Sequence, residues 1–246
     1  MPRRHLLLAL GAAATGGGVA APPPRGAPVL RCTLAALPPL LMPAEAGRVR
    51  GIYADFLYAL ADEVGMELRL QVGPLGRAAR DLTLGESDVT VLLPNDGLGP
   101  DVQSLGDVVP LHLMLQPRPG LPLVDLARLD QLRLIAYVGA GRWGALPAEQ
   151  MRRVSYVTSP CSLMGMLKAG RADAALTVRE ANGHIMKSCG LDPASFPAAL
   201  PLRVRHTQLW ARAGLDPELA HRLRRAREAL VARGLPAQLL KRYELD

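Results

Sequence analysis

No run of about 20 apolar residues occurs in the 246-residue chain, so we expect no membrane-spanning helix. The three cysteines are too few for a disulfide scaffold, and none lies in a Cys-x-x-Cys pair or a Cys/His cluster of zinc spacing, which predicts no metal and no cofactor. Aromatic residues make up only 4% of the chain, which disfavours a stacking platform for sugars or bases. The GxSxG, P-loop and HExxH motifs are also absent, so we expect a protein that is not an enzyme.

The composition, 49% hydrophobic and 21% charged, is that of a folded globular protein. Its formal net charge is +7, and much of the positive charge lies at Arg222, Arg224, Arg225, Arg227, Arg233, Lys241 and Arg242. A basic helix can bind the phosphates of nucleic acid, but this segment has no interleaved aromatics and belongs to no recognisable nucleic-acid module. We therefore interpret it as a solvated helix face and expect no nucleic-acid partner.

The N-terminus has the order of a secretory signal. A basic start with Arg3 and Arg4 precedes the uncharged stretch 6–14, and small residues dominate 15–21. Together with a proline-rich spacer, this signal peptide takes up residues 1–28. It predicts export to the periplasm, by either the Sec or the twin-arginine route.

Export bears on the cysteines, because oxidising compartments permit disulfides. Cys161 and Cys189 could pair, which would leave Cys32 buried in the first strand. Nothing in the sequence fixes the distance between Cys161 and Cys189, so the pairing stays open.

Short apolar runs alternate with helical patterns along the chain, which is typical of βαβ units. In the first half we predict strands and helices over 29–36 (strand), 54–64 (helix), 67–72 (strand), 76–84 (helix) and 89–93 (strand). In the second half we predict strands over 132–138, 154–157 and 172–178, a helix over 160–169 and terminal helices over 217–233 and 235–242. Two βαβαβ passes predict two small α/β lobes.

Several short sequence motifs, here called sequence words, occur in the same order as in a known protein family. They are Gly51–Leu57 (GIYADFL), Leu82–Val89 (LTLGESDV), Leu126–Gly141, Leu167–Ala174 (LKAGRADA) and a terminal helical stretch over 215–233, with Pro38-Pro39 after the first strand. In these words the chain resembles the bacterial extracellular solute-binding proteins of family 3, the polar amino-acid-binding type used by ABC importers. No single word is specific, but together they span nearly the whole mature chain at the spacing of the family.

The resemblance implies an α/β, two-lobed fold like that of the type II periplasmic binding proteins. Each lobe would be a small, mostly parallel sheet flanked by helices, and two hinge segments near 113–117 and 203–208 would join the lobes. Lobe 1 would comprise residues 29–115 plus 206–246, and lobe 2 residues 116–205. A small-molecule solute would bind between the lobes, and the protein, a monomer, would deliver it to the membrane permease of an ABC importer.

Open α/β sheets bind ligands in the loops that follow the carboxyl ends of parallel strands. Gly139 and Gly141 let the backbone approach an anion closely, with Arg142 alongside. Thr158 and Ser159 head a helix whose N-terminus favours negative charge. We therefore expect an anionic or zwitterionic group of the solute at these two places.

The chain departs from the resembled family where the ligand would be held. Amino-acid binders of that family usually carry an Arg after the third strand and an Asp at the end of the last strand of lobe 2. Here 93–101 contains no Arg, and Val178 stands near the position of the Asp. Glu180 could take over the amino group and Arg142 or Arg179 the carboxylate, so the solute is amino-acid-like or an organic anion. The complete set of expected ligand-binding residues is Pro38, Tyr53, Asn95, Asp96, Gly139, Gly141, Arg142, Thr158, Ser159 and Glu180.

Two other functions are open on the same fold. One is a ligand sensor that docks on a membrane receptor, and the other is a dehydratase-like enzyme, because a few relatives of the resembled family are dehydratases. Catalysis would need a general acid or base aimed into the cleft. His112 and His206 lie by the predicted hinges, but neither forms a nucleophile–base pair by spacing.

Overall fold

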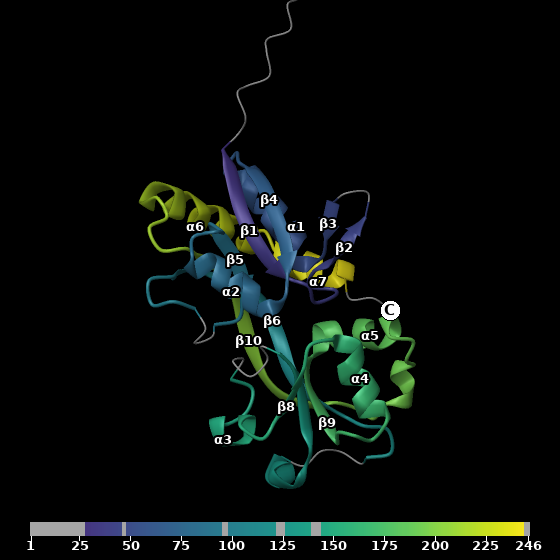
Figure 1. Ribbon diagram of the computed structural model, residues 1–246. Coiled ribbons are helices and arrows are strands. Elements are labelled where there is room, and N and C mark those ends of the chain that lie inside the picture. Colours follow the sequence, from purple (N-terminus) through teal and green to yellow (C-terminus); the bar gives the residue numbers. More distant parts are fainter. Residues whose placement is uncertain (1–27, 46–47, 95–97, 122–125, 139–143, 244–246) are drawn as a thin grey trace, which may run out of the picture.

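The computed structural model describes residues 28–45, 48–94, 98–121, 126–138 and 144–243, and Figure 1 shows how their helices and strands are arranged. The strands are β1 (Val29–Ala35), β2 (Met42–Glu45), β3 (Arg48–Arg50), β4 (Glu67–Gly73), β5 (Val89–Leu92), β6 (Gln103–Pro117), β7 (Leu134–Tyr137), β8 (Ser155–Val157), β9 (Ala174–Val178) and β10 (Leu200–Ala211). In this part of the chain, β2 and β3 form a hairpin, and the other strands form one mixed sheet in the order β4-β1-β5-β10-β6-β9-β7-β8.

The α-helices are α1 (Ile52–Glu63), α2 (Leu75–Thr83), α3 (Ala148–Met151), α4 (Pro160–Lys168), α5 (Arg179–Ser188), α6 (Pro217–Ala232) and α7 (Leu235–Tyr243), with short 3-10 helices at Leu126–Gln131 and Pro193–Ser195. Helix α1 packs against β4, α6 and α7, and helix α2 packs against β1 and β5. Helix α4 packs against β7, β8, β9 and α5. Within the described ranges, none of these helices is both long and apolar enough to cross a membrane.

The sheet has a parallel part at each end, as the sequence predicted for two lobes. Strand β1 pairs in parallel with β4 and β5, and β7 pairs in parallel with β8 and β9. We call β1 to β5 with α1, α2, α6 and α7 the first lobe, and β7 to β9 with α3, α4 and α5 the second lobe; Figure 1 shows them above and below the middle of the molecule. The long antiparallel strands β6 and β10 run through both lobes, so the two small sheets are joined into one.

The crossing between the lobes differs slightly from the predicted hinge segments. Residues 113–117 of β6 already pair with β9 of the second lobe, and residues 208–211 of β10 pair with β5 of the first. Between these ladders, residues 203–206 of β10 pair with residues 110–113 of β6. The crossing section of β6 therefore comes before the predicted one, whereas that of β10 lies within it.

The position and the buried face of helix α1 in the first lobe follow from its local sequence. Phe56, Leu57 and Leu60 recur at helical spacing and are fully buried, as their pattern predicts. The helix begins at Ile52, two residues before the predicted start, directly after Gly51. Gly51 has a φ of 124°, and a Cβ there would lie 2.7 Å from the Leu40 carbonyl oxygen, so only glycine fits this close approach.

An arginine–aspartate cluster, here called the Asp88 clamp, closes the outer end of the first lobe. Arg31 donates to the Asp88 carboxylate from its backbone N, Nε and Nη2 at 3.0, 3.0 and 2.7 Å, and also to the Gly85 carbonyl. Arg212, just past β10, donates to the same carboxylate at 3.0 Å. Burial works to raise the pKa of Asp88, but the bonds from Arg31 and Arg212 outweigh it and lower the pKa.

The Asp173 clamp repeats this arrangement in the second lobe. Arg133 donates to the Asp173 carboxylate from its backbone N, Nε and Nη2 at 3.0, 2.9 and 2.9 Å, and to the Gly170 carbonyl. Arg118, just past β6, donates to the same carboxylate at 3.2 Å. The bonds from Arg133 lower the pKa of Asp173. Each clamp therefore ties the start of a lobe's first strand to the far end of a crossing strand.

Replacing Asp173 with asparagine should lower the free energy of unfolding by about 2 kcal/mol at neutral pH, because the charge-assisted bonds from Arg118 and Arg133 are weakened. The folded-state pKa of Asp173 is lowered, so its carboxylate stabilises the fold above the unfolded pKa, near pH 4, and this contribution is lost as the pH falls. Urea unfolding of both proteins from about pH 7 to about pH 3 should show the difference between them shrinking. The matched control is Asp101→Asn, an exposed carboxyl; an equal effect of both variants would contradict the clamp.

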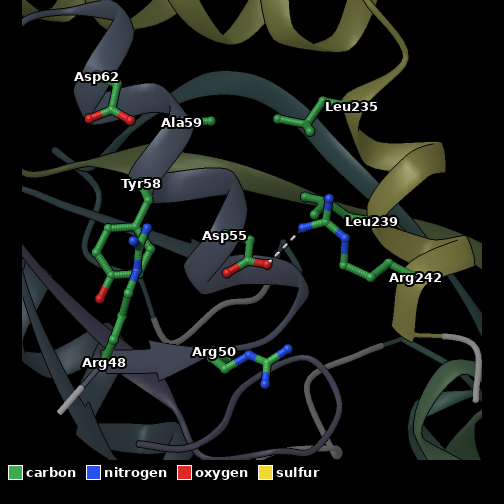
Figure 2. Close-up of a pocket in the computed structure, with 9 residues that line it drawn as sticks. All are labelled: Arg48, Arg50, Asp55, Tyr58, Ala59, Asp62, Leu235, Leu239 and Arg242. Atoms are coloured by element: carbon green, nitrogen blue, oxygen red, sulfur yellow. Dashed lines mark hydrogen bonds and ion pairs between the residues drawn. The ribbon is translucent and has the colours of Figure 1, made fainter. Parts of the chain in front are cut away.

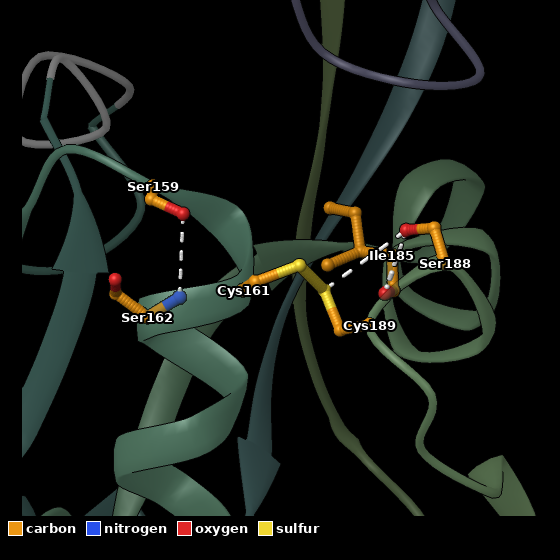
Figure 3. The surroundings of a disulfide bond; sticks show 6 residues. All are labelled: Ser159, Cys161, Ser162, Ile185, Ser188 and Cys189. Carbon is orange, nitrogen blue, oxygen red and sulfur yellow. Dashed lines mark hydrogen bonds between the residues drawn. A yellow bond between two sulfur atoms is a disulfide. The ribbon is translucent and has the colours of Figure 1, made fainter.

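The disulfide left open by the sequence is present between Cys161 at the start of α4 and Cys189 at the end of α5, as Figure 3 shows. The two cysteines meet because α4 and α5 pack against each other. Cys32 is buried in β1, as expected, and burial raises the pKa of its thiol. A free but buried and protonated thiol is a poor nucleophile.

The double variant Cys161→Ser/Cys189→Ser should lose about 3–4 kcal/mol of stability, because the bridge restricts the unfolded chain over a sequence separation of 28 residues. Thermal unfolding with and without a reductant measures this: the reductant should lower the unfolding temperature of the wild type and leave the double variant unchanged. Equal unfolding temperatures of the two proteins without reductant would show that the bridge adds no stability.

Candidate functional site

The carboxyl ends of parallel strands from both lobes meet at the seam between the lobes. Leu37, which follows β1, lies there against Tyr137 at the end of β7, Val178 at the end of β9 and Pro160 at the start of α4. These side chains enclose a cavity of about 10 Å³, enough for about one water molecule. This part of the seam is apolar and closed.

A polar cluster lies where the seam meets the crossing strands. Glu180, the second residue of α5, accepts a hydrogen bond from the backbone N of His112 at 3.0 Å, and its other oxygen lies 2.5 Å from His112 Nδ1. Arg179 lies 3.4 Å from the same carboxylate. The Glu180 side chain is only 1% exposed, so in this state its carboxylate is taken up by the protein itself.

Tyr53 belongs to the same polar cluster. It is 6% exposed, and burial raises the pKa of its phenol; a hydrogen bond with Thr207 opposes this shift and the charge of Glu180 adds to it. The Thr207 hydroxyl in turn donates to the Val109 carbonyl at 3.1 Å. Tyr53 and Glu180, two of the predicted site residues, are thereby brought together across β6 and β10.

The remaining predicted residues are placed in different ways. Ser159 caps α4 by accepting from the backbone N of Ser162 at 3.4 Å, as its sequence position predicts, while Thr158 is exposed. Pro38 is half-buried beside Leu37 in the chain and joins Pro39 through a cis peptide bond. The predicted residues Asn95, Asp96, Gly139, Gly141 and Arg142 lie outside the described residues.

The structure adds one residue that sequence reasoning missed. Arg205 projects from the crossing section of β10 to the Pro94 carbonyl just after β5, at 3.5 Å. It also lies beside Gly144, in the segment after β7. Only the sequence position of Arg205 within the predicted hinge 203–208 could have pointed to it, because its neighbours come from distant parts of the chain.

A second hollow lies on the first lobe alone. It has a volume of about 820 Å³ and is formed by α1, α7 and the β2–β3 hairpin, and Figure 2 shows Arg48, Arg50, Asp55, Tyr58, Ala59, Asp62, Leu235, Leu239 and Arg242 around it. Its charges are largely matched: Arg242 pairs with Asp55 at 3.3 Å, and the Arg48 guanidinium lies 3.9 Å from the centre of the Tyr58 ring. The second lobe contributes no residue to this lining, so the movement of the lobes would not close it.

In the part of the chain that the structure describes, no three His, Cys, Asp or Glu side chains come together in a way that could hold a metal ion. The described acid–base contact at the seam, between His112 and Glu180, is a protein-internal pair.

Comparisons with known proteins define the fold. No protein-family model matches the chain, and no curated protein matches it in sequence. A histidine kinase sensor domain with similarity to periplasmic binding proteins matches with a TM-score of 0.74 at 16% identity, covering 89% of this chain and 97% of that one. The substrate binding protein of an amino acid ABC transporter matches with a TM-score of 0.72 at 16% identity, covering 88% and 99%. An ancestral amino-acid-binding protein described as a precursor of cyclohexadienyl dehydratase matches with a TM-score of 0.69 at 16% identity, covering 87% and 94%.

The chain therefore has the mixed α/β fold of the type II periplasmic binding proteins, as the resemblance in its sequence words implied. It is structurally similar to amino-acid-binding proteins over nearly nine tenths of its length. Sequence identities this low show the fold alone.

Glu180→Gln should lower the free energy of unfolding by about 1–3 kcal/mol, because the carboxylate meets the backbone N of His112 with one oxygen and the ring nitrogen with the other, and the amide has a single acceptor oxygen and no charge. Urea unfolding measures the loss. Glu67→Gln, at the exposed start of β4, is the matched control and should change stability by less than about 0.5 kcal/mol. A loss no larger than that of the control would show that the buried pair is not structural.

Proposed function

We propose that this chain is an exported solute-binding protein that captures a small polar solute, amino-acid-like or an organic anion, between its lobes and delivers it to the permease of an ABC importer. The observation that carries the proposal is the joining of two βαβ lobes by the antiparallel strands β6 and β10, with strand ends from both lobes meeting at one seam. This is an architecture in which a ligand can be enclosed by hinge closure.

The moving parts in this proposal are residues 29–115 plus 206–246 on one side and 116–205 on the other. Rotation of the lobes would lift Leu37 away from Val178 and Pro160 and open the seam to solvent. The apolar cavity there has room for about one water molecule, so at Leu37 the two lobes are in contact.

The ligand-binding residues that we propose are those expected from the sequence: Pro38, Tyr53, Asn95, Asp96, Gly139, Gly141, Arg142, Thr158, Ser159 and Glu180. The position of Ser159 supports an anion subsite, because it caps the N-terminus of α4, whose first residue, Pro160, lies at the seam. For Glu180 to hold an ammonium group, that group would have to replace the contact with His112.

Export to the periplasm is part of the proposal. The order of basic, apolar and small residues at the N-terminus supports it. The disulfide between Cys161 and Cys189 also supports it, because such bonds persist in oxidising compartments.

A sensor that docks on a membrane receptor is the second candidate. The likeness to a histidine kinase sensor domain favours it, since that domain shares the fold over 89% of this chain. A permease and an ATPase gene beside this one would favour transport, whereas a kinase or cyclase gene would favour sensing. A dehydratase-like activity has less support, because the Glu180 carboxylate is 1% exposed and already bonded to His112.

Binding of a solute should raise the unfolding temperature of the protein. At 100 times its dissociation constant a ligand stabilises the folded state by about 2.7 kcal/mol, which corresponds to about 5–10 °C for a chain of this size. A thermal-shift screen of the mature chain against amino acids, organic acids and polyamines measures this, with glycerol at the same concentrations as the control. If no compound in the screen shifts the unfolding temperature more than glycerol does, the proposed solute class is wrong.

A further inference from the structure

Arg205 lies in the section of β10 that crosses between the lobes. It is half-buried and stands opposite Leu111 of β6. Its Nη2 donates to the Pro94 carbonyl oxygen, just past β5, at 3.5 Å. Its Nη1 lies 3.0 Å from the point that a Cβ of Gly144, past β7, would occupy. The guanidinium therefore lies between the carboxyl-end segments of a first-lobe strand and a second-lobe strand, the place where open α/β sheets bind ligands.

Toward the described residues, the hydrogen-bonding capacity of Arg205 is largely unused. A guanidinium carries five N–H donors, and the Pro94 carbonyl takes one of them at a distance that makes only a weak bond. Across the residues that the structure describes, no carboxylate lies within salt-bridge distance of Arg205, whereas Arg31 and Arg133 are each paired with an aspartate. A half-buried charge costs free energy unless a counter-charge meets it, and none of the described residues supplies one to Arg205, so an incoming anion is favoured at this place.

We infer that Arg205 binds a carboxylate group of the solute. The inference rests on the proposed function and names the chemical class that the seam accepts. A guanidinium and a carboxylate are both planar and can be joined by two parallel N–H···O bonds. Such a pair selects the ligand by its charge and also fixes its orientation. A single guanidinium balances one carboxylate, whereas a phosphate dianion would keep an uncompensated charge in a half-buried place.

Gly144 leaves the space that the guanidinium uses. Its φ is +62°, in the left-handed region, and any Cβ at this position would press on Arg205 Nη1 at 3.0 Å. At Gly144 the second lobe thus presents backbone without a side chain to Arg205. A carboxylate held there would be contacted from the crossing strand and from the strand-end segments of both lobes, so its binding would favour the closed state.

The test is isothermal titration of the mature chain with probe pairs that differ only in the carboxylate: amino acids and small organic acids, each beside its amide, together with inorganic phosphate. An acid should bind and its amide should not. Arg205→Ala should weaken binding of that acid about tenfold or more, and Arg205→Lys, which keeps the charge and loses the fork, should weaken it less. Arg203→Ala is the matched control, an exposed arginine on the same strand, and should change affinity by less than about twofold. Thermal unfolding of each variant checks that it is folded, and Arg205→Gln replaces Arg205→Ala if the alanine variant is not.

The outcomes separate this inference from the proposed function. An acid that binds the wild type and the Arg205 variants equally, or an amide that binds as tightly as its acid, overturns the role of Arg205 and leaves the solute-binding function standing. Phosphate that binds more tightly than every acid overturns the carboxylate class. If neither acids, amides nor phosphate bind the wild type, the proposed function fails together with the inference.

Discussion

Charge-assisted hydrogen bonds from paired arginines to Asp88 and Asp173 hold the frame on which the rest of this fold depends. In each clamp one arginine comes from the start of a lobe's first strand and the other from the residue just past a crossing strand. Such bonds are directional and about twice as strong as neutral ones, so they fix where β10 ends in the first lobe and where β6 ends in the second. The middle section of the crossing strands lies between these two clamps.

That middle section carries the chemistry of the seam. His112 of β6 and Thr207 of β10 face Glu180 and Tyr53, the early residues of α5 and α1, while Arg205 reaches the strand-end segments of both lobes. The contact around Leu37 is mainly apolar and encloses only a small cavity. The two lobes are thus held together by an apolar contact in one place and by polar groups in another, and only the polar groups can distinguish one small solute from another.

Most helices and the parallel strands were predictable from the sequence, because their signals are local, whereas the long strands β6 and β10 were anticipated only in part, as hinge segments. Phe56, Leu57 and Leu60, which are buried, predicted α1 by their helical spacing. The Gly-x-x-Asp spacing that occurs in two of the sequence motifs is explained by the two clamps. In each clamp the glycine, Gly85 or Gly170, supplies a carbonyl to the arginine that binds the aspartate. Helix α5 was missed because Val178 before it makes no side-chain cap. The contacts of His112 and Arg205 could not be predicted from the sequence, because their partners, Glu180 and Pro94, are distant in the chain and are brought near only by the fold.

The register of β10 against β6 shifts between His206 and Gln208, where Thr207 alone stands opposite two residues of β6, Val108 and Val109, so that β6 carries a bulge at the edge of the first lobe. A bulge is where a two-stranded ribbon twists most easily, because an unpaired residue interrupts the ladder without breaking it. The Thr207 side chain touches Val109 and Tyr53. Twisting of the β6–β10 ribbon is therefore coupled, through the Thr207 hydroxyl, to Tyr53 in the first turn of α1.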